Sequence, residues 1–220
     1  MLVGCNTPIP PYNLDLTQFN DFLANEGFRD VLPQKDFLEL LKKYSYNGTT
    51  VDDYGAWFYY DGMYGGGCAM NSDEINWQDD YYQNDETGVT RSTNSLSTRV
   101  PLEGLTLPYG ITFEDNVTSA LAKLGIKDDP RLNFTADSGT TDTMTLAANG
   151  NTKLYYIDMT RTTAPIDYIA PFKLKFEQIY KSETSTITRT LELNYYNGLS
   201  SNGYAFYSAN ISVVKSNDSP

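Results

Sequence analysis

Apolar and charged side chains alternate without a break near residue 175. The apolar members are Phe172, Leu174 and Phe176, and the charged ones are Lys173, Lys175 and Glu177. Successive side chains of a β-strand point to opposite faces of a sheet. The pattern therefore predicts an antiparallel strand with one buried face and one solvated face.

Further strands are expected on both sides of this segment. β-branched and aromatic residues with turn signals between them mark these segments. They are Met144–Ala147, Leu154–Met159, Thr186–Tyr196 and Tyr204–Val214. The last one changes phase between Phe206 and Ile211, which predicts a β-bulge.

Three segments instead show the spacing of an amphipathic helix. The first is Thr17–Asn25, which Asp15 or Thr17 caps and Gly27 ends. The second starts at Pro33 and has Lys42 and Lys43 in its last turn. The third has Thr112 as its N-cap and Gly125 just beyond its end.

The order of these elements predicts an α+β fold. We expect two tandem units, residues 12–107 and 108–214, each with one or two helices packed on an antiparallel sheet. Residues 1–11 are rich in proline and read as a tether, and residues 215–220 as a polar tail.

Most of the net charge of −12 comes from one block. Residues 51–90 contain nine acidic residues, no Lys or Arg, and both tryptophans. Ala56–Tyr60 reads as a strand, with Trp57 and Phe58 as core residues. The rest of the block holds the candidate ligand-binding residues, where aromatic rings stack on ligands and carboxylates accept hydrogen bonds. These candidates are Trp77, Asp79, Asp80, Tyr81 and Tyr82.

Composition excludes several classes of function. The chain contains no histidine, so it cannot build a Ser-His-Asp or Cys-His site by itself. Its acidity argues against nucleic acid as a partner. We expect no enzymatic activity and no catalytic residue, although a hydrolase using Asp79 and Asp80, or Asp73 and Glu74, stays open.

No metal or cofactor is expected. Calcium at an irregular site, in residues 71–76 or 84–88, is the alternative, because oxygen ligands are plentiful there.

The chain opens Met-Leu-Val-Gly-Cys, which matches the lipobox of bacterial lipoproteins. The match predicts a lipid anchor on Cys5 and an extracytoplasmic protein at the cell surface that meets the membrane only through this anchor. If Met1 is the true start, the protein is cytoplasmic instead. The other cysteine, Cys68, has no histidine to activate it and reads as an inert residue.

The segment from Leu105 to Gly125 reads Leu-Thr-Leu-Pro-Tyr-Gly-Ile-Thr-Phe-Glu-Asp-Asn-Val-Thr-Ser-Ala-Leu-Ala-Lys-Leu-Gly. It resembles a segment of secreted lipoproteins of Gram-positive gut bacteria, where a helix precedes an antiparallel sheet. Glu114 stands where those proteins commonly have glycine. The helix-then-sheet unit over 105–214 is also similar to the domains of beta-lactamase inhibitory protein and of the SmpA/OmlA lipoproteins. The resemblance implies this fold, an extracytoplasmic location and a binding role, with no catalytic residues.

Together these features predict a non-enzymatic binding or structural module, with a protein as its partner. The alternative is a carbohydrate-binding or carbohydrate-acting module that uses residues 51–90.

Overall fold

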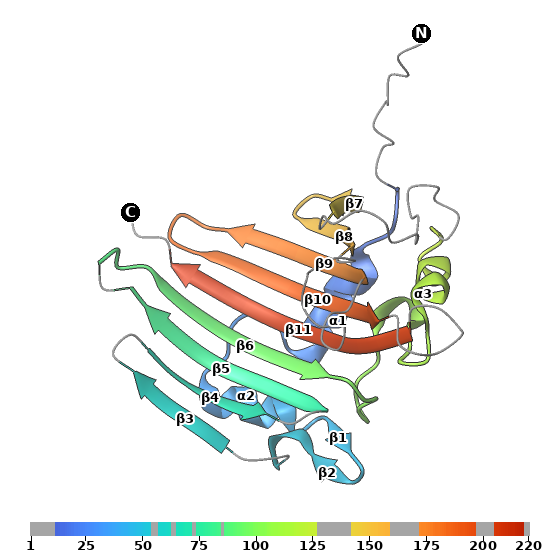
Figure 1. The fold of residues 1–220 in the computed structure, drawn as a ribbon. Coiled ribbons are helices and arrows are strands. Elements are labelled where there is room, and N and C mark those ends of the chain that lie inside the picture. The colour runs from blue at the N-terminus through green and yellow to red at the C-terminus, as the bar shows by residue number, and fades with distance from the viewer. Residues whose placement is uncertain are drawn as a thin grey trace.

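The computed structural model describes residues 12–53, 57–62, 65–71, 74–84, 86–126, 142–158, 172–196 and 205–217. The side chains of 57–62, 65–71, 142 and 158 lie outside the description. The protein has an α+β fold (Figure 1). Its α-helices are α1 (Thr17–Glu26), α2 (Gln34–Leu41) and α3 (Val117–Lys123), with short 3₁₀ turns at Val51–Asp53 and Pro108–Gly110.

Nine of the strands form one antiparallel sheet in the order β3-β4-β5-β6-β11-β10-β9-β8-β7. Their bounds are β3 Trp57–Gly62, β4 Gly65–Asn71, β5 Ile75–Gln83, β6 Thr90–Thr98, β7 Asp142–Asn149, β8 Thr152–Asp158, β9 Phe172–Lys181, β10 Thr186–Tyr196 and β11 Ala205–Asn217. The short strands β1 (Ser45–Tyr46) and β2 (Thr49–Thr50) form a separate hairpin.

The sheet consists of two meanders that meet in its middle. Residues 12–107 supply the run from β3 to β6, and residues 108–214 supply β7 to β10 and most of β11. β6 and β11 are the last strands of the two runs, and they pair antiparallel, with Leu96 opposite Ile211. The two expected units therefore share one sheet and one core.

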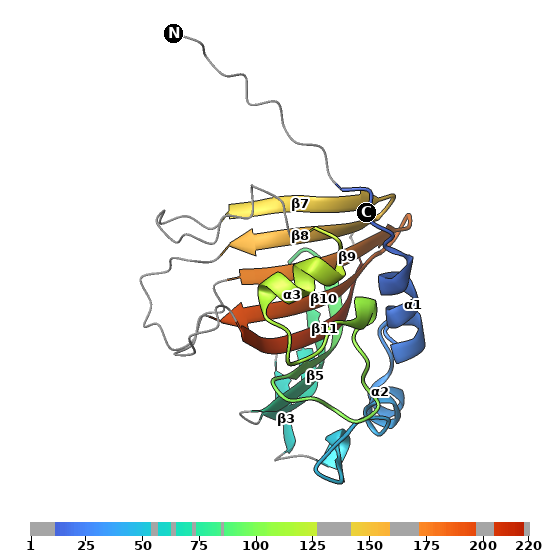
Figure 2. The same ribbon diagram turned by 90° about the vertical axis from the view of Figure 1, so that its right-hand side faces the viewer.

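Helices α1 and α2 lie on the same face of this sheet, and α3 lies at one end of β9, β10 and β11 (Figures 1 and 2). Phe19 of α1 stacks on Phe176 of β9 with ring centroids 5.3 Å apart. Phe37 of α2 meets Trp77 of β5 edge-on at 6.2 Å. The two helices thus cover different parts of one buried surface.

One row of buried side chains crosses six neighbouring strands in register. Its members, from β5 to β8, are Trp77, Leu96, Ile211, Leu191, Phe176 and Leu154. Burial of a large apolar side chain contributes about 1.5–3 kcal/mol, so rows of this kind hold the two meanders together. In β9 this row contains Phe176. The alternation in the sequence of the strand places Lys173, Lys175 and Glu177 on the opposite face.

The predicted helices are found with adjusted ends. α1 ends at Glu26, and Gly27, whose φ of 87° suits glycine, is its C-cap. The predicted N-cap was wrong, because Leu16 occupies this position and makes no side-chain cap, while Asp15 accepts hydrogen bonds from the N–H and hydroxyl of Thr17. α2 begins after Pro33, and Lys42 follows its last residue.

The start predicted for the third helix was wrong. Asn116, not Thr112, caps α3 by accepting from the Ser119 N–H. Asp115 instead closes a turn by accepting from the Thr112 N–H at 2.6 Å. The pair of Thr112 and Asp115 therefore forms a turn that precedes α3 and does not cap the helix.

The strands match the sequence closely in the second half of the chain. β10 has the predicted bounds, and β11 contains the predicted bulge, where Tyr207 is the extra residue opposite β10. β11 continues to Asn217, so residues 215–217 belong to the sheet rather than to a tail. No helix in the described part of the chain is long and apolar enough to cross a membrane.

Candidate functional site

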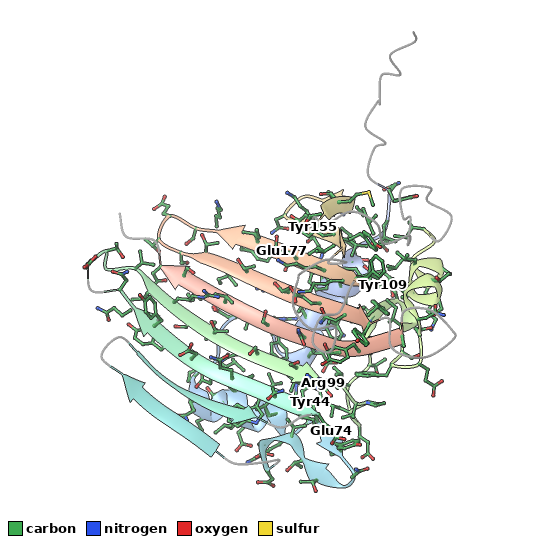
Figure 3. The ribbon with its side chains drawn as sticks, viewed as in Figure 1. Tyr44, Glu74, Arg99, Tyr109, Tyr155 and Glu177 are labelled. Carbon is green, nitrogen blue, oxygen red and sulfur yellow. The ribbon has the colours of Figure 1, made fainter. Side chains whose placement is uncertain are left out.

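The face of the sheet turned away from α1 and α2, here called the open face, carries polar side chains. A row one residue away from the buried row crosses the same strands in register. From β5 to β8 it contains Gln78, Ser95, Ser212, Thr190, Glu177 and Lys153. Figure 3 looks onto this face, with Tyr155 and Glu177 labelled. The alternation that builds the core therefore also builds a continuous polar surface.

The open face is hollowed over its four central strands, and the hollow has a volume of about 600 Å³. Most of its lining consists of small hydroxyl and amide side chains with a few charged ones. The lining residues are Arg91, Ser95, Leu96, Ser97, Lys175, Glu177, Thr188, Thr190, Glu192, Asn210, Ile211, Ser212, Val214 and Ser216. The small side chains on the neighbouring strands β6, β11 and β10 leave this space free.

The carboxylates on the floor of the hollow are already paired. Lys175 Nζ lies 2.6 Å from Glu177 Oε2, and Lys173 Nζ lies 2.7 Å from Glu192 Oε2. The Ser97 hydroxyl donates to Asn210 Oδ1 at 2.6 Å. Groups held by their neighbours lose little freedom when a ligand arrives, which favours binding.

An aromatic and cationic cluster lies at one end of the open face. The guanidinium of Arg99 is 4.7 Å from the ring centroid of Tyr207, and the rings of Tyr207 and Tyr196 are 6.1 Å apart. Tyr207 is the bulged residue of β11, and such bulges redirect a side chain relative to a regular strand. We call Arg99, Tyr196 and Tyr207 the tyrosine–arginine cluster; Figure 3 labels Arg99 where β6 ends.

The structure does not place Trp77 at a ligand surface. Its side chain is 2 % exposed and packs against Phe37, so its assignment as a binding residue was wrong. The polar neighbours that pointed to exposure, such as Gln78, lie on the other face of the same strand.

The remaining candidates in β5 are divided between the two faces of the sheet. Asp80 and Tyr82 lie on the open face, where Tyr82 is 44 % exposed. Asp79 and Tyr81 lie on the face with the helices, where the Tyr81 hydroxyl donates to Gln83 at 3.1 Å. The five residues therefore do not form one site, and Asp79 and Asp80 cannot act on one bond as a carboxylate pair.

Asp79 has a structural role on the helix side. Its carboxylate accepts from the buried side-chain Nδ2 of Asn94 at 2.9 Å, and Oδ1 of the same side chain accepts from the Leu32 N–H at 2.6 Å. Burial, with a smaller effect from the charge of Asp80, raises the pKa of Asp79 above its ordinary value. Asp79 thus joins β5 to the segment before α2.

Other predicted residues lie outside the described parts of the chain. These are Cys5 and Asp73, together with the side chains of Trp57, Phe58 and Cys68. Within the described ranges, no group of three acidic or cysteine side chains gathers as a metal site would require. In the proposed calcium segment 84–88, Asn84 Oδ1 instead accepts from the N–H groups of Glu86 and Thr87.

The sequence reasoning missed the residues that the structure gathers on the open face. In the sequence these residues are the charged positions of the alternating pattern in β9 and the polar positions in β10 and β11. Only the strand order shows that they lie on one surface. No family model matches the chain, and comparisons with curated proteins and with solved structures give no significant match.

Proposed function

We propose that this protein is a non-enzymatic binding module that holds a protein partner on its open face. One observation carries the proposal: α1 and α2 both cover the same face of the sheet, and the other face is hollowed and lined by polar groups. A sheet face with many hydrogen-bonding groups directed away from the core is suited to a complementary surface.

The size of the open face fits a protein partner. Six strands from β5 to β8 span about 24 Å at ~4.8 Å per step, and strands of this length extend about 30 Å. The resulting area of roughly 700 Å² is close to the ~800 Å² that each partner buries in a standard interface. Such a face accommodates a folded surface or an extended segment with its flanks.

The tyrosine–arginine cluster supplies an anchor beside the polar hollow. Tyrosine and arginine are enriched among the residues that dominate binding energy. The ring of Tyr207 offers apolar area, and the Arg99 guanidinium above it keeps donors for a partner. We propose that this cluster forms the energetic centre of the interface.

We also propose that Cys5 is acylated and tethers the module outside the cytoplasm of a bacterial cell. The support is the Leu-Val-Gly-Cys match followed by a proline-rich segment. The resemblance of residues 105–214 to secreted lipoproteins points to the same location. Mass spectrometry of the protein isolated from the cells that encode it should show acylated Cys5, and an unmodified cysteine would overturn the tether.

Photo-cross-linking tests the binding face directly. A benzoylphenylalanine residue replaces Tyr207 on the open face in one variant and Lys35 on α2 in the other, within cells that encode the protein. We expect one discrete protein adduct from the first variant and none of that mass from the second. The captured protein is then purified, and its Kd for wild type and for Tyr207→Ala is measured. Equal adducts from both positions, or equal Kd values, would refute the proposal.

Carbohydrate is a second candidate, because the floor of the hollow offers several hydroxyls and an amide that pair with sugar hydroxyls. In this reading Tyr82, exposed on the open face and opposite Arg91, replaces Trp77 as the stacking ring. A glycan array probed with wild type and Tyr82→Ala separates the candidates. Tyr82-dependent glycan binding would favour carbohydrate over a protein partner.

A further inference from the structure

The charge of the open face differs in sign from that of the whole chain. The chain has a net charge of −12. Among the described strand residues from β5 to β8, the open face carries Arg91, Lys153, Lys173, Lys175 and Lys181 against Asp80, Glu177 and Glu192. The excess on this face is therefore positive.

Once the ion pairs of the floor are set aside, the described strands leave three cations on this face against one carboxylate, that of Asp80, which accepts a hydrogen bond from Gln78 Nε2 at 3.3 Å. Lys173 and Lys175 neutralise Glu192 and Glu177 on the floor of the hollow. Arg91, Lys153 and Lys181 make no ion pair with any residue that the structure describes. We call these three residues the cationic ring.

The three residues of the cationic ring lie on different strands, at one end and along one side of the hollow. Arg91 of β6 is part of its lining, and Lys181 of β9 lies in the same cross-strand row, reached through Ser216 and Thr186. Lys153 of β8 is directly opposite Glu177, a lining residue of β9. Glu86 and Glu183 lie in turns beyond the strand ends, exposed and not paired with the ring.

We propose that the partner contacts the open face through an acidic segment whose carboxylates meet the cationic ring. This proposal rests on the proposed function and specifies the chemistry of the partner. The Arg91 guanidinium can bind a carboxylate through two hydrogen bonds, and the hydroxyls of the floor can donate to a second one. The remaining acidity of the chain acts weakly on this site, because charges beyond about 8 Å are screened at physiological salt.

A protein segment suits these residues better than an anionic polysaccharide. The tyrosine–arginine cluster and the area of the face match a protein interface. A polysaccharide could also use the cationic ring and the hydroxyls of the floor. Binding of an anionic polysaccharide is therefore a competing outcome of the test.

The test uses two fluorescent peptides and three forms of the full chain. One peptide alternates glutamate with glycine over about 20 residues, and its match has glutamine in place of glutamate. The forms are wild type, the ring variant Arg91→Ser/Lys153→Ser/Lys181→Ser, and the control Arg29→Ser/Lys35→Ser/Lys43→Ser. The control removes the same charges from exposed residues in and around α2. Circular dichroism and thermal melting establish that all three are folded.

We expect fluorescence anisotropy at about 150 mM salt, where the remaining acidity of the chain is screened, to show that wild type and control bind the glutamate peptide equally. The ring variant should bind it about tenfold more weakly, and the glutamine peptide should not bind. Equal binding of the glutamate peptide by the ring variant would overturn the proposal. So would ring-dependent binding of heparin without binding of the peptide, which assigns the ring to an anionic glycan.

A second copy of this acidic chain is the other competing occupant. Sedimentation velocity of wild type should show no association that the ring variant abolishes, and such association would overturn the proposal. The proposed function fails separately, if the protein captured through position 207 binds Tyr207→Ala as tightly as wild type. If that binding requires Tyr207 but is unchanged in the ring variant, only the acidic-segment proposal is refuted.

Discussion

Asp79 and Asp80 are neighbours in the sequence, yet they lie on opposite faces of the nine-stranded sheet. Asp79 faces the helices and accepts a hydrogen bond from Asn94 at 2.9 Å, whereas Asp80 lies on the open face. The acidic and aromatic block of residues 51–90 is therefore not one surface where the structure describes its side chains. In β5 it contributes to the core layer and to the open face in alternation.

This relationship predicts different effects of charge removal at the two positions. Burial raises the pKa of Asp79, so the folded state binds a proton more tightly than the unfolded chain. The contribution of Asp79 to the free energy of unfolding must therefore fall as the pH rises above 3.8, the ordinary pKa of an aspartate. Asp79→Asn keeps an oxygen acceptor for Asn94 and removes this fall. Urea unfolding from about pH 3.5 to 7 measures it.

Asp80→Asn is the matched control for that experiment. It should keep the pH dependence caused by the burial of Asp79. An identical pH profile for Asp79→Asn and wild type would contradict the description of Asp79 as a partly buried carboxyl.

Trp77 and Tyr82 should differ sharply in their effect on stability. Trp77→Ala opens a cavity against Phe37 and should lower the free energy of unfolding by about 3–5 kcal/mol. Tyr82→Ala removes a ring that is 44 % exposed and should change it by roughly 0.5 kcal/mol. Chemical denaturation monitored by far-UV circular dichroism gives both values, and similar losses would argue against a buried Trp77.

The turn before α3 depends on Asp115. Burial alone would raise the pKa of this carboxyl, but hydrogen bonds from Lys123, Thr112 and Ser119 outweigh it and lower the pKa. Asp115→Ala removes the four hydrogen bonds that these residues donate and should cost about 1–3 kcal/mol, measured by thermal unfolding.

Its neighbour Glu114 is exposed, and Glu114→Ala should cost no more than about 0.5 kcal/mol. Because the Asp115 pKa is lowered, its contribution to stability is present above its ordinary value of 3.8 and is lost as pH falls further. A larger loss from Glu114→Ala than from Asp115→Ala would contradict this account of the turn.

Binding and folding should separate at Tyr207. Its ring lies over the open face beside Arg99, outside the row of buried side chains that joins the strands. Tyr207→Ala should therefore keep the melting temperature within a few degrees and weaken the captured partner about tenfold or more. A variant that loses stability and binding together would indicate that the bulge mainly serves the sheet.

Local patterns in the sequence were sufficient to predict much of the fold. The bounds of β10 and the bulge near Tyr207 follow from side-chain alternation and its interruption. β4 and β5 were not predicted as strands, because Gly65–Gly67 carry no side-chain pattern and Asp79-Asp80 are unusual in a strand. Their pairing in the sheet overrides these weak propensities.

The candidate site depended on information that the sequence does not display. Ser95, Thr190 and Ser212 are unremarkable polar residues until β6, β10 and β11 become neighbours. The pairing of β6 with β11 joins segments more than a hundred residues apart, as the bond from Ser97 to Asn210 illustrates. Trp77 was misjudged because sequence neighbours on a strand face opposite sides.

The most direct test of the open face as the binding surface is the Kd of the protein captured through position 207, measured by calorimetry for two tryptophan variants. Ser212→Trp fills the centre of the hollow, between Ser95 and Thr190. Thr49→Trp places the same side chain on the exposed β1–β2 hairpin, outside the sheet. We expect Ser212→Trp to weaken binding about tenfold or more and Thr49→Trp to bind like wild type. Unchanged binding by a folded Ser212→Trp would contradict the assignment of the open face as the binding surface.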